Sequence, residues 1–473
     1  MTAAMTKVSA FTDDCLGELD AVGIAQALRA GNFSAEEAAR AALARIDAVE
    51  PQLNAVAQDD RRRGLARAAA GDFPDGSLRG VPSMIKNNTL FAGIPTQHGS
   101  AAVPPTPADR NEGFTDQMLA SGINILGATT LPAFGLTAST EFVDRPPTRN
   151  PWNTEYSAGA SSGGAAALVA AGALPIAHAN DGGGSIRIPA ACCGLVGLKP
   201  TRDRVVASAE AKGMPIDLIS NGIVSRTVRD TAHFLADTQR YAPGKNMPEL
   251  GLVEGPSGRK LRIALISESI TGGLLDAQTS VALESVAELL AAQGHMIDRV
   301  PLPVNRNYVQ QFTDYWALLA FSLDHFGKRV LDKGFDRSKL DPFTAGLSRT
   351  FIKRFWRTPG VLMGLQKSTK QFHALFEDFD VVYSPTLGHT TPKIGYLDPG
   401  GDFDEIFERL INYVTFTPAN NTSGSPAISL PLAQSADGLP IGLHFGADLG
   451  QEQMLLELAY QLEAERPFAR IQD

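Results

Sequence analysis

Hydrophobic positions recur at helical spacing along the first 60 residues. One helix is predicted to end near Gly31. A second is predicted to begin at Ser34, an N-cap residue with Glu37 three positions later, which together form a capping box. Apolar residues then recur on one face of this helix, and Pro51 is predicted to stop it. These helices are expected to be scaffold.

Short β-rich runs alternate with helical periodicity from about residue 80 onwards. Strands are predicted at 81–85, 123–126, 262–266 and 381–383, and a helix at 277–293. Near the C-terminus, the runs 427–432 and 441–445 flank Asp437-Gly438, which predicts a β-hairpin. This alternation indicates an α/β protein with a central twisted mixed β-sheet covered by helices on both faces.

Residues 302–376 differ from the neighbouring segments, because they show helical periodicity and few signals of β-strands. Aromatic residues are frequent there: Tyr308, Phe312, Tyr315, Trp316, Phe321, Phe351, Phe355 and Trp356. These rings either form core or wall an apolar substrate pocket beside the sheet.

No linker, repeat or charge block divides the chain, since its 45 glycines and 30 prolines are scattered as turn signals. We therefore predict one large domain over residues 1–473. Its expected parts are N-terminal helices at 1–60, a core with the chemical motifs at 80–225, a helical aromatic-rich insert at about 302–376, and a C-terminal sheet and helix at 377–473.

The net charge and the cysteine content limit which binding partners and which cellular compartment we expect. A net charge of −9 argues against general affinity for nucleic acid or an anionic membrane, because both need basic patches. Two of the three cysteines, Cys192 and Cys193, are adjacent, which disfavours a mutual disulfide and fits a reducing compartment. The N-terminus lacks a signal-peptide apolar core, and no apolar run approaches about 18 residues. We expect a cytoplasmic protein.

Glycine-rich loops around two serine positions mark the segment 150–201. It contains Gly159-Ala-Ser-Ser-Gly-Gly164 and Asp181-Gly-Gly-Gly-Ser-Ile-Arg187. Three consecutive glycines before Ser185 leave backbone N–H groups unshielded, so these groups can converge on one oxygen as in an oxyanion hole. An isolated triple glycine more often forms a plain turn.

The motifs that accompany this loop favour a catalytic role over a plain turn. Together they make the segment resemble the amidase-signature family of serine hydrolases. That family combines a Gly-Gly-Ser-Ser-Gly-Gly loop, an Asp-x-Gly-Gly-Ser-Ile-Arg loop and an earlier strand of the form Gly-[Ile/Val]-Pro-x-x-x-Lys. All three occur here in order, the last as Gly80-Val-Pro-Ser-Met-Ile-Lys86. Further matching stretches are Asn150-Pro-Trp-Asn153, Gly197-Leu-Lys-Pro-Thr201 and Asn421-Thr-Ser-Gly-Ser-Pro-Ala427.

The resemblance implies a catalytic triad in which Ser185 is the nucleophile, Ser161 the bridging serine on a cis peptide bond, and Lys86 the terminal base. The family spacing between the two serines selects Ser161 over Ser162. Chemically, a lysine can accept the serine proton only when it is neutral, and burial without a carboxylate partner lowers its pKa. Ser161 can relay the proton between Ser185 and Lys86.

The loop around the nucleophile is expected to supply the remaining groups. The N–H groups of Gly182, Gly183 and Gly184 are predicted oxyanion donors. Asp181 and Arg187 are expected to brace the loop by hydrogen bonds rather than to touch substrate.

The sequence departs from the family pattern at several positions. Ala160 replaces the usual glycine before Ser161, so a cis Ala-Ser bond must be accommodated. Asn87 replaces a common aspartate after Lys86, which should help to keep that lysine neutral. The familiar Lys, Asn and Glu of the following strand region are replaced by Ala128, Thr130 and Ala133, which leaves the inherited substrate preference open.

Other interpretations of the serine loop are weaker. Gly159 to Gly163 also fits the G-x-S-x-G nucleophile elbow with Ser161 attacking, but that motif requires a preceding strand and residues 150–156 look turn-like. Ala165 occupies the position of the phosphate-binding lysine of a P-loop. No metal-ligand spacing is present, so neither a metal nor a cofactor is expected. Three histidines that could lie near the site are His98, His178 and His444.

The resemblance implies hydrolysis of C–N bonds in small-molecule amides, with carbamates and esters as companions. The aromatic insert resembles free-standing members that act on nylon-type oligomers, aryl amides or carbamates (urethanes). The alternative is a glutamine-amidase subunit of a tRNA-dependent amidotransferase. We expect a monomer or homodimer without nucleic-acid or membrane partners. Residues 202–220 are either a mobile flap or a plain surface loop.

Overall fold

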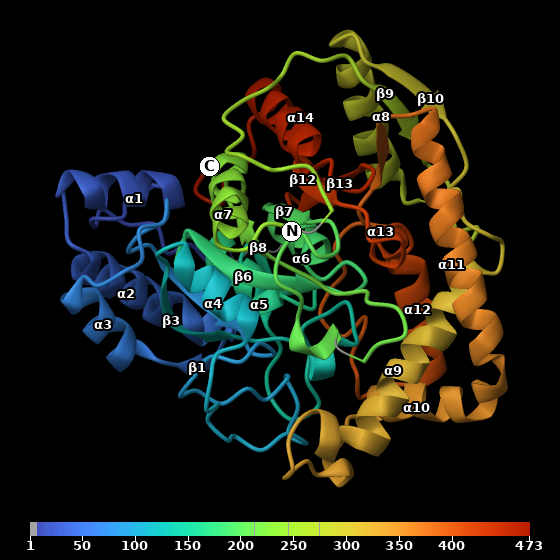
Figure 1. Ribbon diagram of the computed structural model, residues 1–473, viewed down its shortest axis with the longest axis horizontal. Helices are drawn as coiled ribbons and strands as arrows, with labels where there is room; N and C mark the ends of the chain where they lie inside the picture. Colours follow the sequence, from blue (N-terminus) through green and yellow to red (C-terminus); the bar gives the residue numbers. More distant parts are fainter. Residues whose placement is uncertain (1–6, 212, 245, 274) are drawn as a thin grey trace, which may run out of the picture.

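An eight-stranded sheet forms the centre of the computed structural model, which describes residues 7–211, 213–244, 246–273 and 275–473 (Figure 1). Its strands in spatial order are β10 (Met296–Arg299), β9 (Arg262–Leu265), β11 (Val381–Pro385), β13 (Pro440–Gly446), β12 (Ala427–Gln434), β7 (Val196–Lys199), β8 (Ser220–Ser225) and β6 (Ile176–Asp181). The pairs of β9 with β10 and β11 are parallel and the other pairs antiparallel. The prediction of a mixed sheet is confirmed.

The helices are numbered in chain order. They are α1 (Ala21–Ala30), α2 (Ala35–Leu53), α3 (Arg61–Ala70), α4 (Gly113–Ala120), α5 (Gly163–Ala170), α6 (Arg187–Cys193), α7 (Val228–Tyr241), α8 (Ala277–Ala292), α9 (Tyr308–Val330), α10 (Pro342–Arg354), α11 (Thr358–Ala374), α12 (Phe403–Tyr413), α13 (Pro418–Ser423) and α14 (Glu452–Glu465).

Both faces of the sheet are covered, as successive residues of β13 show. His444 contacts Arg187 of α6, whereas the next residue, Phe445, stacks on Tyr383. The Tyr383 hydroxyl donates to Leu283 of α8. Because neighbouring side chains of a strand point to opposite faces, α6 and α8 lie on opposite sides of the sheet. The expectation of a helix-covered sheet is confirmed.

A second, three-stranded sheet lies beside β6 and consists of β1 (Val56–Asp59), β3 (Asn124–Thr129) and β2 (Pro82–Lys86). The Ser83 hydroxyl of β2 donates to the carbonyl of Ile176 in β6, so the two sheets meet along these strands. All five residues of β2 are buried. The small residues of α5 are all buried against this junction, where larger side chains would hold the strands apart.

The N-terminal helices lie together at the left of Figure 1, and they largely match their prediction. Gly31 ends α1 with φ 74°, and the Ser34–Glu37 capping box begins α2. The prediction that Pro51 stops this helix is wrong, because Pro51 lies inside α2 and Asn54 ends it with φ 51°. A proline within the last turn removes only one hydrogen bond, which the surrounding burial of Val49 and Leu53 tolerates.

Helices α9, α10 and α11 form a separate group at the right of Figure 1. Their aromatic residues divide between the interior and the surface. Tyr308 and Tyr315 are buried, which fits the core interpretation, but Phe355 and Trp356 are 60% and 66% exposed. At the C-terminus, β12 and β13 form the predicted antiparallel hairpin. In the described part of the chain, no helix combines the length and apolar character needed to cross a membrane.

Candidate active site

Lys86 ends β2 at the junction of the two sheets and is fully buried. Its Nζ lies 2.7 Å from Ser161 Oγ and 2.7 Å from Asn180 Oδ1. No carboxylate among the described residues pairs with this amine. Burial lowers the pKa of Lys86 to about 7, while the charges of Glu210 and Asp181 oppose that shift. Close to neutral pH, a large fraction of Lys86 is therefore an uncharged amine that can accept a proton.

Ser161 lies between the strand β5 (Asn153–Ser157) and helix α5, and only 3% of it is exposed. The Ala160–Ser161 peptide bond is cis, so the alanine in place of the usual glycine is accommodated. Gly135 covers the Ser161 hydroxyl closely. A methyl group added at Gly135 would stand 2.9 Å from Ser161 Oγ, and its φ of 67° also favours glycine.

Ser185 lies in the turn between β6 and α6 and is half-buried, unlike Lys86 and Ser161. The neighbouring Ser162 hydroxyl donates to the Ser185 carbonyl at 2.6 Å, which joins the two serine loops. Within the described residues the Ser185 hydroxyl itself forms no hydrogen bond, so it is not hydrogen-bonded to Ser161 in this structure. Catalytic hydrogen bonds are often long without substrate and tighten in the complex.

An ion pair between Asp181 and Arg187 braces the turn that carries Ser185. Arg187 Nε lies 2.9 Å from Asp181 Oδ2, and both side chains are fully buried. Burial opposes ionisation of Asp181, but the adjacent guanidinium outweighs it and holds the pKa of that carboxyl well below its usual range. Asn421 completes the brace, since it donates to Asp181 Oδ1 and accepts from Arg187.

The Asp181 carboxylate also engages one of the main-chain N–H groups in the turn that carries Ser185. Its Oδ1 accepts from the Gly184 N–H at 2.7 Å, so the prediction of Gly184 as an oxyanion donor is not supported. A buried carboxylate outcompetes a transient substrate oxygen for that hydrogen. Among the described groups, no partner engages the N–H groups of Gly182, Gly183 and Ser185, which leaves them available to a substrate oxygen.

The three histidines named from the sequence lie around this site in supporting positions. His178 Nδ1 accepts from the Lys86 main-chain N–H, and burial lowers the pKa of His178 to about 3. His444 Nε2 accepts from Arg187, because a guanidinium only donates. His98 Nδ1 lies 2.9 Å from Glu210 Oε1, in the segment 202–220. Residue 212 of that segment lies outside the described residues.

Apolar side chains border the turn that carries Ser185. A methyl group at Gly183 would stand 3.7 Å from Phe312 Cζ of α9, and one at Gly182 would stand 3.7 Å from Ile219 Cγ1. Both are ordinary contact distances, so these side chains lie beside Gly183 and Gly182. This arrangement favours an apolar group of a substrate beside the turn.

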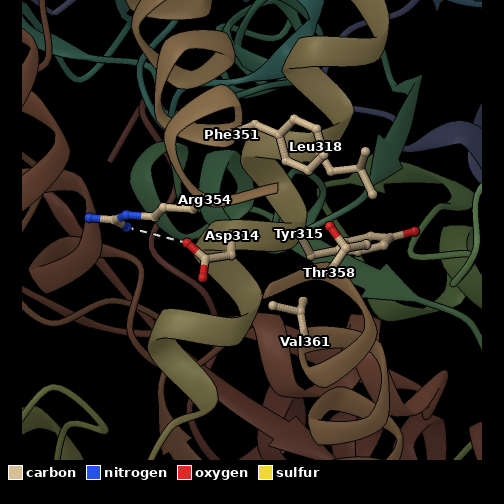
Figure 2. Close-up of a pocket in the computed structure, with 7 residues that line it drawn as sticks. All are labelled: Asp314, Tyr315, Leu318, Phe351, Arg354, Thr358 and Val361. Atoms are coloured by element: carbon tan, nitrogen blue, oxygen red, sulfur yellow. Dashed lines mark hydrogen bonds and ion pairs between the residues drawn. The ribbon is translucent and has the colours of Figure 1, made fainter. Parts of the chain in front are cut away.

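A separate cavity between α9, α10 and α11 lies close to the Asp314–Arg354 ion pair (Figure 2). It encloses about 10 Å³, the space of one water molecule. Tyr315 lines it and also binds Ile216 of the segment 202–220 through its hydroxyl. The cavity is too small for a substrate and is structural.

The segment before Ser161 differs from its prediction. The prediction that residues 150–156 are turn-like is wrong, because β4 (Arg149–Asn150) and β5 form a short hairpin there. A strand therefore does precede Ser161. The elbow remains disfavoured because Ser161 is buried and its hydroxyl bonds to Lys86 rather than to a histidine. In residues 7–211, 213–244, 246–273 and 275–473, no group of His, Cys, Asp and Glu is placed to hold a metal ion.

Three polar residues at the site were not identified from the sequence: Asn180, Ser162 and Thr417. Thr417 donates to the Gly183 carbonyl at 2.6 Å. Asn180 and Ser162 stand directly beside motif residues, which was a usable signal. Thr417 carries no local signal, because it reaches the turn from the position just before α13, far along the chain.

Comparisons with known proteins agree with this geometry. A protein-family model of amidases matches residues 37–456. A Mycobacterium leprae (strain TN) protein named "Putative amidase AmiC" is 45% identical over 469 residues, 99% of each chain. The 6-aminohexanoate-cyclic-dimer hydrolase of Paenarthrobacter ureafaciens is 31% identical over 95% of each chain. A solved structure of 6-aminohexanoate cyclic dimer hydrolase complexed with substrate superposes with a TM-score of 0.84 at 29% identity, covering 96% of this chain and 98% of the other. The chain therefore belongs to the amidase family and is a hydrolase of amides.

Proposed function

We propose that this amidase forms an acyl-enzyme on Ser185, with Ser161 as proton relay and Lys86 as base, and that it also accepts carbamates and esters. The observation that carries this proposal is the buried 2.7 Å contact between Lys86 Nζ and Ser161 Oγ, in which no carboxylate of the described residues pairs with the amine. The half-buried Ser185 is the member of the three that a substrate can reach.

In the first step, Ser185 Oγ attacks the carbonyl carbon while its proton passes to Ser161, whose own proton passes to Lys86. The resulting oxyanion accepts hydrogen bonds from the free N–H groups of Gly182, Gly183 and Ser185. The C–N bond then breaks, and the amine leaves with a proton from Ser161, which Lys86 replaces. Water then gives a proton to Ser161, whose own proton passes to Lys86, and attacks the acyl carbon. The bond from that carbon to Ser185 Oγ breaks, Ser185 regains its proton through Ser161, and the acid leaves.

The Ser162 contact supports this sequence of steps. It fixes the main chain of Ser185 next to the residue that follows Ser161. No hydrogen bond in the described part of the chain holds the Ser185 side chain, so its hydroxyl is free to change rotamer about the Cα–Cβ bond.

We further propose that the protein is a free-standing cytoplasmic enzyme, a monomer or homodimer, that acts on small amides with an apolar acyl group. Phe312 and Ile219 beside the turn support the apolar group. The match to 6-aminohexanoate cyclic dimer hydrolase over nearly all of both chains supports a free-standing enzyme over an amidotransferase subunit.

The purified chain alone, mixed with a chromogenic acyl anilide, tests the proposal. We expect release of the aniline by the natural chain and none by Ser185→Ala. Turnover by Ser185→Ala at the natural rate would exclude Ser185 as nucleophile. Activity on glutamine only, and only with a partner subunit present, would support the amidotransferase alternative instead.

A further inference from the structure

Asn180 contacts Lys86, the proposed base, and the proposed triad assigns no role to this contact. It is the penultimate residue of β6, and only 4% of it is exposed. Its Oδ1 lies 2.7 Å from Lys86 Nζ, and its main-chain oxygen lies 3.5 Å from the same atom. The Nδ2 of its carboxamide has no hydrogen-bond partner among the described residues. Within that part of the chain, the carboxamide therefore bonds to Lys86 alone.

The contact with Asn180 determines how the hydrogens and the lone pair of Lys86 Nζ are oriented. A neutral amine carries two hydrogens and one lone pair. Both oxygens of Asn180 can only accept, so they draw the two hydrogens of Lys86 Nζ toward themselves. The lone pair is then left for the third neighbour, the Ser161 hydroxyl, at 2.7 Å. A carboxamide turned the other way would offer an N–H to the lone pair and compete with Ser161.

We propose that Asn180 is a positioning residue that directs the lone pair of Lys86 at Ser161 by accepting the amine hydrogens without adding a charge. This inference rests on the proposed role of Lys86 as base. It assigns to a neutral amide the function of orienting the base, which a carboxylate at the same place would perform only by trapping the ammonium form.

The charged and titratable neighbours of Lys86 fit this assignment. Asp181 of β6 is paired with Arg187, so its charge is largely compensated. His178 of β6 is neutral, since burial lowers its pKa to about 3. Glu210 of the segment 202–220 is the main group favouring the ammonium, and it is engaged by His98. An uncompensated carboxylate at position 180 would shift this balance.

The test compares Asn180→Asp and Asn180→Leu, which keep the approximate size of the side chain. We expect Asn180→Asp to move the acid limb of the kcat/KM profile upward by about one to three pH units, because an opposite charge now touches the amine. We expect Asn180→Leu to lower kcat by up to about 100-fold with little change in KM, because the lone pair is no longer directed. Asn124→Asp makes the same chemical change at a buried site beside Arg67, at the far end of β3 from Lys86, and should leave the pH profile unchanged.

The outcomes separate this inference from the proposed triad. If Lys86→Ala is inactive but Asn180→Asp keeps the natural pH profile and Asn180→Leu the natural kcat, Asn180 does not position the base and the triad stands. If Lys86→Ala keeps full activity, the triad itself is wrong. Should Asn180→Asp fail to fold, the kcat of Asn180→Leu decides alone, and a natural value would overturn the inference.

Discussion

Lys86 Nζ lies 2.7 Å from Ser161 Oγ, and the two residues are 0% and 3% exposed. Water therefore has little access to this pair, and the uncharged form of the lysine is favoured by its surroundings. Ser185, in contrast, is half-buried. The proposed base therefore lies in a dry interior, whereas the proposed nucleophile is accessible to substrate.

Activity should depend on pH through Lys86. Burial lowers the pKa of this amine from its ordinary value to about 7. The base is neutral above that value and protonated below it, so kcat/KM should rise with pH and reach half its plateau near pH 7. Measuring hydrolysis of an anilide between pH 5 and 9 checks this. Full activity at pH 5 would be inconsistent with a neutral lysine base.

Removing the proposed base should greatly lower turnover without unfolding the protein. Lys86→Met is expected to lose about 10²–10⁴-fold in kcat, the usual contribution of general acid–base catalysis. Lys199→Met is a matched control, because burial likewise lowers the pKa of Lys199 to about 7, yet its amine bonds to the Pro200 carbonyl and not to either proposed catalytic serine. Steady-state kinetics should show a small loss for Lys199→Met. Equal losses for both variants would point to a general effect of removing a buried amine.

Ser162 should matter although it is not in the triad. Its hydroxyl donates to the Ser185 carbonyl at 2.6 Å and so holds the nucleophile turn. Ser162→Ala is expected to lower kcat by up to about 100-fold, because small misplacements of a nucleophile are costly. Ser162→Thr keeps a hydroxyl and should retain more activity than Ser162→Ala. The reverse order of the two variants would rule out a role for this hydrogen bond.

The ion pair under the nucleophile turn should contribute to stability. Arg187→Met leaves the buried Asp181 carboxylate without its guanidinium, and removing one partner of a buried pair typically costs about 3–5 kcal/mol. Urea denaturation monitored by circular dichroism measures this change in the free energy of unfolding. The double variant Asp181→Asn with Arg187→Met should be less destabilised than Arg187→Met alone. A double variant as unstable as the sum of the single variants would argue against direct coupling.

Local sequence patterns predicted the elements well but not their arrangement. The Ser34 capping box and the Asp437-Gly438 hairpin depend on neighbouring residues only, and both form as predicted. The order of the strands depends on partners far apart in the chain, such as β12 beside β7, which no local period encodes. The hairpin at β4 and β5 was missed because two residues and five residues are too short to show alternation.

The resemblance predicted that Ser161 would contact Lys86 and that Asp181 and Arg187 would brace the loop, but it did not predict every contact at the site. The structure brings Lys86 and Ser161 together, and it engages Gly184 with Asp181 instead of leaving its N–H free. The contact of Asn180 with Lys86 could not be predicted, because it depends on how β2 lies against β6. Such pairing across two sheets is a property of the packed core.

Covalent labelling tests the central claim most directly. A fluorophosphonate reacts with a serine that is activated by a base and faces oxyanion donors. Intact-protein mass spectrometry followed by peptide mapping should find one adduct, on Ser185, formed quickly by the natural chain and slowly or not at all by Lys86→Met. An adduct on Ser161 with Ser185 unmodified, or equal labelling rates for the two proteins, would contradict the proposed relay.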